Sequence, residues 1–345
     1  TMRRFSKAFV TVLAAVGVQA AWAGADLVVD APTLASSVTV ELQTFAADAC
    51  ELQPVDLCVG APGGRKVLRF SVFTPNQGDA DLIVGDPTLN PGELLPNGDN
   101  KWVFSQCHNH YHFQTFARYE LRRRGESTPV LTGQKRSFCI EDTRRTTATS
   151  SPRYCCNPGP ACPETLQGIQ HGWGDLYPSN LPCQWIDITD GPSAGTEVAP
   201  GDYDLCVFLN TGGFLDEQPQ DNDSACVPLT IDPPNRPSPR VKVQRPRARR
   251  VVKVGKTYKI AWKKKLPGEF QQQEVWWSKD GGVSWTLLAT TSRRAGVFPW
   301  TVPADGVTET AKVRVIVWQR YPKDGKTAGS YQRGVGESGV FRVTP

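Results

Sequence analysis

The chain has 345 residues, which exceeds the size of one ordinary domain and favours two. Its formal net charge of +5 is modest for this length, although the basic residues are unevenly distributed. After the N-terminal segment, no stretch approaches the roughly 20 consecutive apolar residues that a membrane-spanning helix needs. The composition therefore excludes a protein that crosses a membrane with several helices.

The N-terminus has the features of a secretory signal peptide. Residues 2–7 carry three basic side chains, and the apolar segment 8–18 follows them. Residues 21–23, Ala-Trp-Ala, have the small-x-small form of a cleavage site. We therefore predict a signal peptide over residues 1–23 and a soluble protein that is secreted or periplasmic. The alternative is an uncleaved membrane anchor, which the short apolar segment disfavours.

Ten cysteines follow this segment, and all of them lie between Cys50 and Cys226. Cysteines behind an export signal indicate an oxidising compartment and a disulfide framework, and export argues against nucleic acid as a partner. The cysteines end just before a stretch whose prolines prevent helix and sheet interior alike. These changes predict an upstream domain over 24–232, a proline-rich linker over 233–240 and a downstream domain over 241–345.

Alternating apolar and polar residues predict strands in both domains, and helical periodicity is scarce. We expect a mostly β protein, in which the upstream domain has long loops pinned by disulfides. The downstream domain has the pattern of a small immunoglobulin-like or fibronectin-like β-sandwich. Residues 278–285 resemble an Asp-box hairpin, to which we assign no chemistry. The clearest strands are at 68–73, 203–208, 257–262, 273–277 and 311–318.

Three of the four histidines, His108, His110 and His112, occupy alternate positions in the sequence Cys-His-Asn-His-Tyr-His. Side chains two residues apart point to the same face of a strand, so these three can converge on one ion if the strand curls. Imidazole suits copper and zinc, and no fourth protein ligand is nearby, which leaves a position for water or substrate. The alternative is a row of solvated histidines. We predict a metal site.

The segments around these histidines resemble the lysyl oxidase family. The motif at 107–112, followed by Phe116 and by Tyr-Glu-Leu at 119–121, is similar to the copper-binding segment of that family. The sequences at 133–143 and 177–190 are similar to two further blocks, in the family's order and at similar spacing. The likeness extends over nearly the whole upstream domain.

The resemblance implies a copper amine oxidase whose organic cofactor, lysyl tyrosylquinone, is made from its own side chains. By position the lysine is Lys135, the tyrosine is Tyr177, and the copper ligands are the three histidines. Such an enzyme converts a primary amine, either a small amine or a protein lysine side chain, to an aldehyde, consuming O₂ and releasing hydrogen peroxide and ammonia. A catalytic base is also needed. Of Asp175, Asp187 and Asp190 we assign Asp187, because strand alternation can turn it toward the ring.

The resemblance also has departures, which concern the substrate more than the metal. Trp173 stands where animal members have a cysteine, and Trp102 lies two residues farther from Cys107 than the family's usual tryptophan. A C-terminal sandwich replaces the long basic propeptide and scavenger-receptor modules of animal members. Collagen and elastin are therefore not assumed as substrates.

The resemblance implies five disulfides, although spacing alone does not determine their connectivity. By family position the pairs are Cys50–Cys58, Cys107–Cys162, Cys139 with Cys155 or Cys156, Cys183 with the other of these two, and Cys206–Cys226.

Some members of the family carry a calcium ion that ties the N-terminal strand to a late acidic loop. Calcium prefers six to eight oxygen ligands. The alternative here is a solvated acidic loop. The oxygen groups at the matching positions belong to Asp26, the Leu27 carbonyl, Glu217, Asn222 and Asp223.

The segment from Arg240 to Lys265 contains many Lys and Arg residues and no Asp or Glu. Clustered cations can hold a protein near an anionic cell surface or matrix polymer. We favour the alternative, a linker and first strand with a solvated charged face, because charge runs are commonly solvated.

Two other functions fit parts of the sequence. One is a non-catalytic extracellular binding or matrix module that holds a metal and never forms the quinone. The other is a zinc hydrolase with a histidine-bound water, which is disfavoured because it requires neither Lys135 nor Tyr177.

Overall fold

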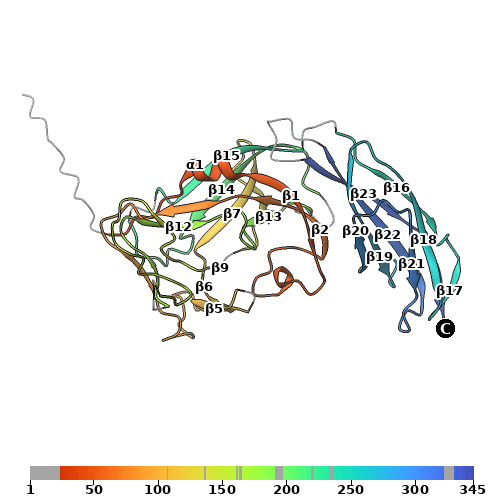
Figure 1. Ribbon diagram of the computed structural model, residues 1–345, viewed down its shortest axis with the longest axis horizontal. Helices are drawn as coiled ribbons and strands as arrows, with labels where there is room; N and C mark the ends of the chain where they lie inside the picture. Colours follow the sequence, from red (N-terminus) through yellow and green to blue (C-terminus); the bar gives the residue numbers. More distant parts are fainter. Residues whose placement is uncertain are drawn as a thin grey trace, which may run out of the picture.

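The computed structural model describes residues 24–106, 108–135, 137–160, 162, 165–190, 197–218, 221–232, 236–321 and 330–345. The predicted signal peptide, Cys107 and residues 233–235 of the predicted linker lie outside this part. Within it, no helix is both long enough and apolar enough to cross a membrane. Figure 1 shows two lobes side by side, an upstream lobe of short strands and a C-terminal lobe of long strands. The prediction of a mostly β fold is confirmed.

The upstream lobe contains many short antiparallel strands around a large apolar core, with a smaller apolar cluster around Trp185. Its largest sheet has the order β15-β14-β7-β8, and smaller sheets have the orders β1-β2-β13, β10-β12-β3, β5-β6-β9 and β11-β4. The elements are α1 (Ala31–Ser37), β1 (Thr39–Phe45), η1 (Cys50–Leu52), β2 (Gly63–Arg69), β3 (Val72–Pro75), β4 (Leu82–Gly85), β5 (Trp102–Ser105), β6 (His110–Gln114), β7 (Ala117–Arg123), β8 (Pro129–Thr132), β9 (Ser137–Phe138), β10 (Arg144–Arg145), β11 (Gln167–Ile169), β12 (Trp173–Tyr177), β13 (Trp185–Asp187), β14 (Gly201–Leu209) and β15 (Ser224–Ile231).

The predicted strand at 203–208 lies within β14, where Leu205 and Val207 are fully buried. The prediction of one strand at 68–73 is wrong. The chain changes sheets there, because β2 ends at Arg69 and pairs with β1 and β13, whereas β3 begins at Val72 and pairs with β12. The alternation of apolar and polar residues continues through this change of sheet, so the sequence pattern does not show where one strand ends and the next begins.

Four disulfides are resolved among the described cysteines: Cys58–Cys183, Cys139–Cys156, Cys155–Cys162 and Cys206–Cys226. The predicted Cys206–Cys226 pair and one of the two alternatives for Cys139 are confirmed. The other family-based pairs are wrong, because Cys58 bonds to Cys183 and Cys162 bonds to Cys155. Which cysteines meet in the folded chain cannot be deduced from their spacing in the sequence.

The C-terminal lobe is a β-sandwich without cysteines. One sheet has the order β16-β18-β21, and the other contains β17-β24-β22-β19-β20 with β23 paired to β22. Its core includes Trp277 and Trp300, whose ring centroids are 5.4 Å apart. The predicted strands at 257–262, 273–277 and 311–318 all lie within its elements. These are β16 (Arg240–Arg245), β17 (Val251–Lys253), β18 (Thr257–Lys265), β19 (Glu269–Ser278), β20 (Thr286–Thr291), β21 (Val297–Thr301), β22 (Thr308–Tyr321), β23 (Ser330–Glu337) and β24 (Phe341–Thr344).

The turn between β19 and β20 is the predicted Asp-box. The carboxylate of Asp280 accepts hydrogen bonds from the backbone N–H groups of Val283 and Ser284. The Trp285 indole N–H donates to the Gly282 carbonyl at 2.9 Å. These bonds close the turn and leave the carboxylate occupied, which supports a structural role.

The two lobes contact each other through a buried carboxylate and an apolar face. Glu274 on β19 is 1% exposed and accepts hydrogen bonds from the Gly64 backbone N–H of the upstream lobe and from the Trp318 indole N–H. The Arg333 guanidinium on β23 donates to the Thr189 carbonyl at 3.1 Å. The apolar part of the contact contains Trp276, Ile316 and Trp318, with Leu42, Trp285, Leu287 and Tyr331 packed against them.

Candidate active site

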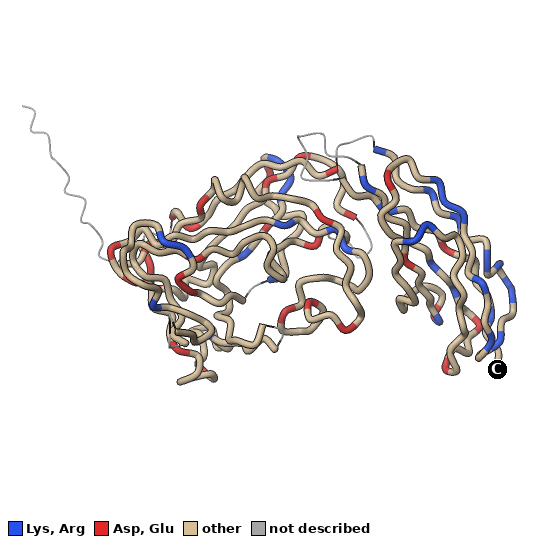
Figure 2. The backbone as a smooth tube through the Cα atoms, in the orientation of Figure 1, with Lys and Arg blue, Asp and Glu red and all other residues tan. Residues whose placement is uncertain are grey.

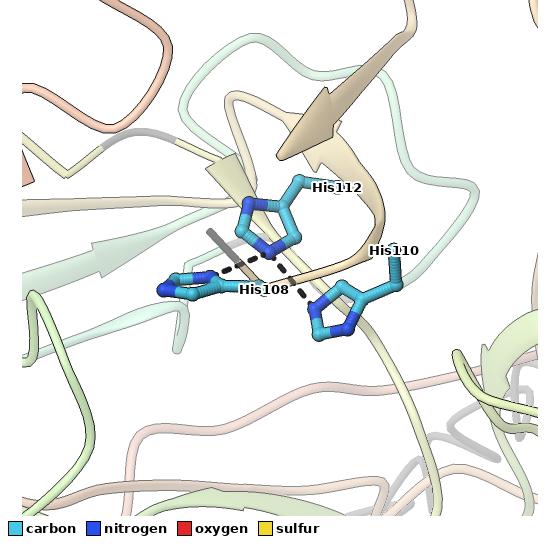
Figure 3. A group of neighbouring side chains, drawn as sticks. All are labelled: His108, His110 and His112. Atoms are coloured by element: carbon cyan, nitrogen blue, oxygen red, sulfur yellow. Dashed lines mark hydrogen bonds between the residues drawn. The ribbon is translucent and has the colours of Figure 1, made fainter. Parts of the chain in front are cut away.

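The three histidines of the motif converge on one point (Figure 3). The Nε2 atom of His112 lies 3.2 Å from Nδ1 of His108 and 3.0 Å from Nε2 of His110. His110 and His112 point from the same face of β6, while His108 precedes the strand in the β5–β6 turn. Asn109 has a φ of 57° and bends the chain between them. Asparagine tolerates this left-handed conformation better than most residues, so the curl that the ion requires is built into the turn.

The imidazoles are held in the form that binds metals. Burial lowers the pKa of His112 to about 2 and the pKa of His110 to about 4, so both rings are neutral and their nitrogens can act as ligands. The outer Nδ1 atoms are oriented by neighbours, Ser137 Oγ at 3.2 Å from His112 and Asn157 Nδ2 at 3.1 Å from His110. Such contacts fix ring orientation in metal sites. The residues therefore fit a copper or zinc ion.

Lys135 and Tyr177 lie next to each other beside the histidines. Lys135 precedes β9 and Tyr177 ends β12, and the lysine Nζ is 5.4 Å from the tyrosine ring centroid. Both side chains are less than a tenth exposed. The Tyr177 hydroxyl donates a hydrogen bond to the Cys139 carbonyl at 2.6 Å. Burial lowers the pKa of Lys135 to about 8, so a substantial fraction of the amine is neutral near physiological pH and can act as a nucleophile.

A cavity of about 310 Å³ joins these groups. It provides space for a small amine or for the end of a long amine side chain. Its lining residues are His108, His110, His112, Lys135, Cys139, Glu141, Thr143, Asp175, Leu176, Tyr177, Leu181 and Pro182.

Asp175, rather than Asp187, is the aspartate at this cavity. It is 1% exposed, and burial holds its pKa well above its usual range. Its carboxylate accepts hydrogen bonds from the Glu141 backbone N–H and the Thr143 hydroxyl, both at 3.2 Å. Asp175 and Tyr177 are two residues apart on β12 and therefore share a face. The alternation rule that led us to Asp187 could therefore have placed Asp175 beside Tyr177.

Asp187 is committed to a structural contact. It lies on β13, which pairs with β2 and not with the strand that carries Tyr177. Its carboxylate pairs with the Arg65 guanidinium at 2.7 Å and also accepts the Gly60 backbone N–H. Asp190, the third carboxylate considered from the sequence, pairs with the same Arg65. The expectation that alternation turns Asp187 toward the tyrosine ring therefore fails, because its pairing with Arg65 could not be foreseen from the sequence.

Two disulfides fix the walls of the cavity. Cys139, whose carbonyl accepts the Tyr177 hydroxyl, is bonded to Cys156. Cys183 follows the lining residue Pro182 directly and is bonded to Cys58. Because these walls are loops rather than long strands, the covalent bonds limit how far they can move.

The five predicted calcium ligands are close together at the N-terminal end of the upstream lobe. Glu217 accepts the Leu27 backbone N–H at 2.9 Å, and Asn222 donates to Asp26 at 2.8 Å. Burial raises the pKa of Glu217 to about 7 and that of Asp223 to about 6.

Several oxygens of this cluster lack partners. Glu217 Oε1, Asn222 Oδ1 and Asp223 Oδ1 are buried without a hydrogen bond. Buried acceptors without donors are costly, and a hard cation would satisfy them. The carboxylates converge less closely than the three histidines, whose ligand atoms lie within 4.8 Å of one another in the described part of the chain.

Comparisons with known proteins agree with the geometry. A sequence model described as lysyl oxidase matches residues 25–233. Lysyl oxidase homolog 3A of Danio rerio is 36% identical over 192 residues, which are 54% of this chain and 23% of that protein. Lysyl oxidase homolog 2 of Xenopus tropicalis is 32% identical over 216 residues, which are 61% of this chain and 25% of that protein. The chain thus spans about a quarter of the length of these relatives.

Among solved structures, fibronectin(III)-like modules of Clostridium thermocellum CbhA align with 68% of this chain and 85% of their own, at a TM-score of 0.23 and 11% identity. That likeness is too low to bear on function. The lysyl oxidase match instead covers more than half of the chain and includes the whole histidine, lysine and tyrosine constellation. The chain belongs to the lysyl oxidase family.

Proposed function

We propose that the protein is a copper-dependent amine oxidase that uses a quinone built from Lys135 and Tyr177. The overall reaction converts a primary amine, O₂ and water to an aldehyde, ammonia and hydrogen peroxide. One observation carries this proposal, namely that the three histidines, Lys135 and Tyr177 line a single cavity. A zinc hydrolase or a simple metal module requires neither the buried lysine nor the buried tyrosine.

The histidines would hold the copper ion through Nδ1 of His108 and Nε2 of His110 and His112, the atoms that converge. When bound, the copper and the quinone supply the oxidising chemistry, because the metal promotes oxidation of the tyrosine ring by O₂ and the ring then accepts electrons from the amine. Ser137 and Asn157 keep the imidazoles in the ligating orientation.

Lys135 would join the tyrosine ring through its neutral amine. It has no ion-pair partner among the described residues, and its Nζ lies over the rings of Phe138 and Tyr177 at 4.8 and 5.4 Å. This environment keeps the amine reactive and directed at the ring. The Cys139 carbonyl fixes the ring by accepting its hydroxyl. Holding the two groups in contact replaces a bimolecular encounter with a local step.

We propose Asp175 as the proton acceptor for the carbon next to the substrate nitrogen. It lines the cavity together with Lys135 and Tyr177, and burial raises its pKa, which makes its ionised form a stronger base. The Thr143 hydroxyl and the Glu141 N–H orient its two oxygens. Its burial also excludes water that would otherwise compete for the proton.

We further propose that calcium occupies the cluster around Glu217 and ties the N-terminal segment to the loop before β15. The unpartnered buried oxygens of that cluster support this role. The disulfides and the sequence of residues 1–23 support export to the periplasm or the extracellular space. Small amines and lysine side chains of proteins are the substrate classes that the cavity size accommodates.

The test is hydrogen peroxide release from copper-loaded protein with a panel of primary amines. We expect activity in the parent and none in Lys135→Ala or Tyr177→Phe. Lys279→Ala and Tyr258→Phe in the C-terminal lobe are matched controls and should retain activity. No peroxide from any amine, with one copper bound per chain, would contradict the oxidase and favour a non-catalytic metal-containing module.

A further inference from the structure

The outer surface of the sheet β16-β18-β21 is strongly basic. On β16, Val241 and Val243 pack toward the core, and on β18 the buried residues are Ile260 and Trp262. The residues between them therefore point outward. Figure 2 shows the cations gathered on these outer strands. We call the following six exposed residues the basic sheet face: Arg240, Lys242 and Arg245 on β16, and Lys259, Lys263 and Lys265 on β18.

The strand register places like charges directly opposite each other on this face. Arg240 pairs with Lys265, and Lys242 pairs with Lys263. Directly opposed side chains on adjacent antiparallel strands are close neighbours, so two cations at such a position repel and destabilise the sheet. A face that is merely exposed to solvent does not require opposed cations. One acidic residue in either strand would relieve their repulsion.

No acidic side chain neutralises the face in the described part of the chain. The segment 240–265 contains no Asp or Glu, and neither does the third strand, β21. Other cations of the same lobe are paired, for example Lys279 with Asp305 and Lys312 with Glu337. By contrast, none of the six cations of the basic sheet face has an ion-pair partner among the described residues.

The basic sheet face continues into a cleft of about 510 Å³ at the end of the sheet. Arg245 and Lys259 belong to both, and Arg247 and Arg250 add two more cations to the cleft wall. The remaining lining residues are Pro246, Val252, Thr257 and Tyr258. Four cations around one concave site, with no acidic lining residue, create a positive potential that attracts anions.

We propose that the basic sheet face and its cleft bind an acidic polysaccharide, a linear polymer that carries sulfate or carboxylate groups. The cations are spread over two strands and a cleft, so they match a repeating array of anions better than a single small anion. This inference goes beyond the amine oxidase function and does not depend on it. It gives the C-terminal lobe a role in placing the enzyme at a charged matrix or cell surface.

Other polyanions fit less well. The exposed large apolar residues beside the face are Val251 and Val297, and membrane-surface binding usually adds Trp, Phe or Leu side chains that enter the lipid. Binding of single-stranded nucleic acid relies on exposed aromatic rings. The ring of Tyr258 is partly buried, and its hydroxyl accepts the Lys253 backbone N–H.

The test uses the full-length protein and two charge reversals, Lys263→Glu and Lys265→Glu, each of which creates an opposite-charge pair with the facing cation. We expect each variant to bind heparin, the probe, about tenfold more weakly and with a shallower salt dependence. We also expect each variant to melt at a higher temperature, because the cross-strand repulsion is removed. A higher melting temperature with unchanged heparin affinity would overturn the proposal and leave a merely solvated face.

The controls distinguish the effect of losing charge at the proposed site from the effect of lowering the net charge of the protein. The double variant Lys279→Gln/Lys312→Gln removes two cations that are already paired in the same lobe, and it should bind heparin as the parent does. Arg247→Gln/Arg250→Gln removes the same number from the cleft and should weaken binding. Equal losses in both double variants would overturn the site. Tighter binding to phosphatidylserine vesicles or to single-stranded DNA than to heparin would overturn the polysaccharide assignment.

Discussion

Two buried polar centres of this molecule differ in how their charged groups are satisfied. At the contact between the lobes, the Glu274 carboxylate receives four N–H donors, from Gly64, Gln272, Trp276 and Trp318. In the candidate active site, the Lys135 amine has no ion-pair partner among the described residues and faces aromatic rings instead. Both groups are buried, but only the Glu274 carboxylate has protein partners that satisfy its charge.

This difference distinguishes a structural site, at Glu274, from a candidate catalytic site, at Lys135. Buried polar groups in folded proteins are nearly always hydrogen-bonded, and those that are not need an explanation. Glu274 needs no further explanation, because its carboxylate is hydrogen-bonded where the lobes meet. Lys135 and the three converging imidazoles are explained when a metal and a covalent cofactor complete the site. The same reasoning applies to the unpartnered oxygens near Glu217.

Among residues outside the metal and quinone groups, the largest expected effect comes from Asp175→Asn. If Asp175 accepts the substrate proton, its amide replacement should lower kcat by about 10²- to 10⁴-fold. Copper content and the visible spectrum of the quinone should stay unchanged, because Asp175 is not a metal ligand. Asp187→Asn, at the carboxylate paired with Arg65, is the matched control and should retain kcat. A larger loss of kcat in Asp187→Asn than in Asp175→Asn would reverse the assignment of the base.

Ser137→Ala tests the orientation of the metal ligands. The serine hydroxyl contacts Nδ1 of His112, and losing such an outer contact typically weakens metal affinity about 10- to 100-fold. Copper competition titration measures the change. Ser150→Ala, which removes a hydroxyl that contacts only Trp173 and Gln170 among the described residues, serves as the control. Equal copper affinities in both variants would show that the Ser137 contact does not orient the ligand.

Calcium should stabilise the upstream lobe. A cation that binds only the folded state adds about 2.7 kcal/mol of stability at one hundred times its Kd. Thermal melting in EGTA and in excess calcium measures this shift. Glu217→Gln should abolish the difference, whereas Glu337→Gln, in an exposed ion pair of the C-terminal lobe, should not. A melting temperature that does not respond to calcium would reject the ion.

Glu274→Gln tests the other side of the comparison. The amide cannot accept all four N–H donors, so we expect the loss of about 1 to 3 kcal/mol of unfolding free energy. Copper binding and kcat should be unaffected, because the contact lies outside the active-site cavity. Chemical denaturation measures the stability. A drop in kcat without a drop in stability would mean that this contact acts on the catalytic site.

The smallest effect is the pH dependence of cofactor formation. The reactive form of Lys135 is the neutral amine, and its lowered pKa of about 8 makes that form more abundant as the pH rises. The rate of quinone formation after copper addition should therefore rise about fivefold between pH 7 and 8 and level off above pH 9. The absorbance of the quinone follows it. A rate that falls over this range would contradict the nucleophilic lysine.

The sequence predicted those features that depend on local pattern. The histidines share one curled strand and turn, so their spacing alone was sufficient to infer convergence. The long strands of the sandwich, such as β22, follow from uninterrupted alternation. Lys135 and Tyr177 were found only through resemblance, because Lys135 precedes β9, Tyr177 ends β12, 42 positions later, and no local rule joins them.

The features that failed depend on which segments meet in space. The pairing of Cys58 with Cys183 joins segments 125 residues apart, so loop spacing gave no guidance. Asp187 was expected to face the tyrosine ring, but it pairs with Arg65, which belongs to a strand far away in the chain. Likewise, the Gly64 N–H reaches Glu274 only through the contact between the lobes, across 210 positions of sequence.

The most direct test of the proposed quinone is peptide mapping of the copper-loaded protein by mass spectrometry. We expect the peptides containing Lys135 and Tyr177 to be recovered as one cross-linked species, and this species to be absent from protein prepared without copper. Recovery of both peptides separate and unmodified, from protein with its full complement of copper, would contradict it.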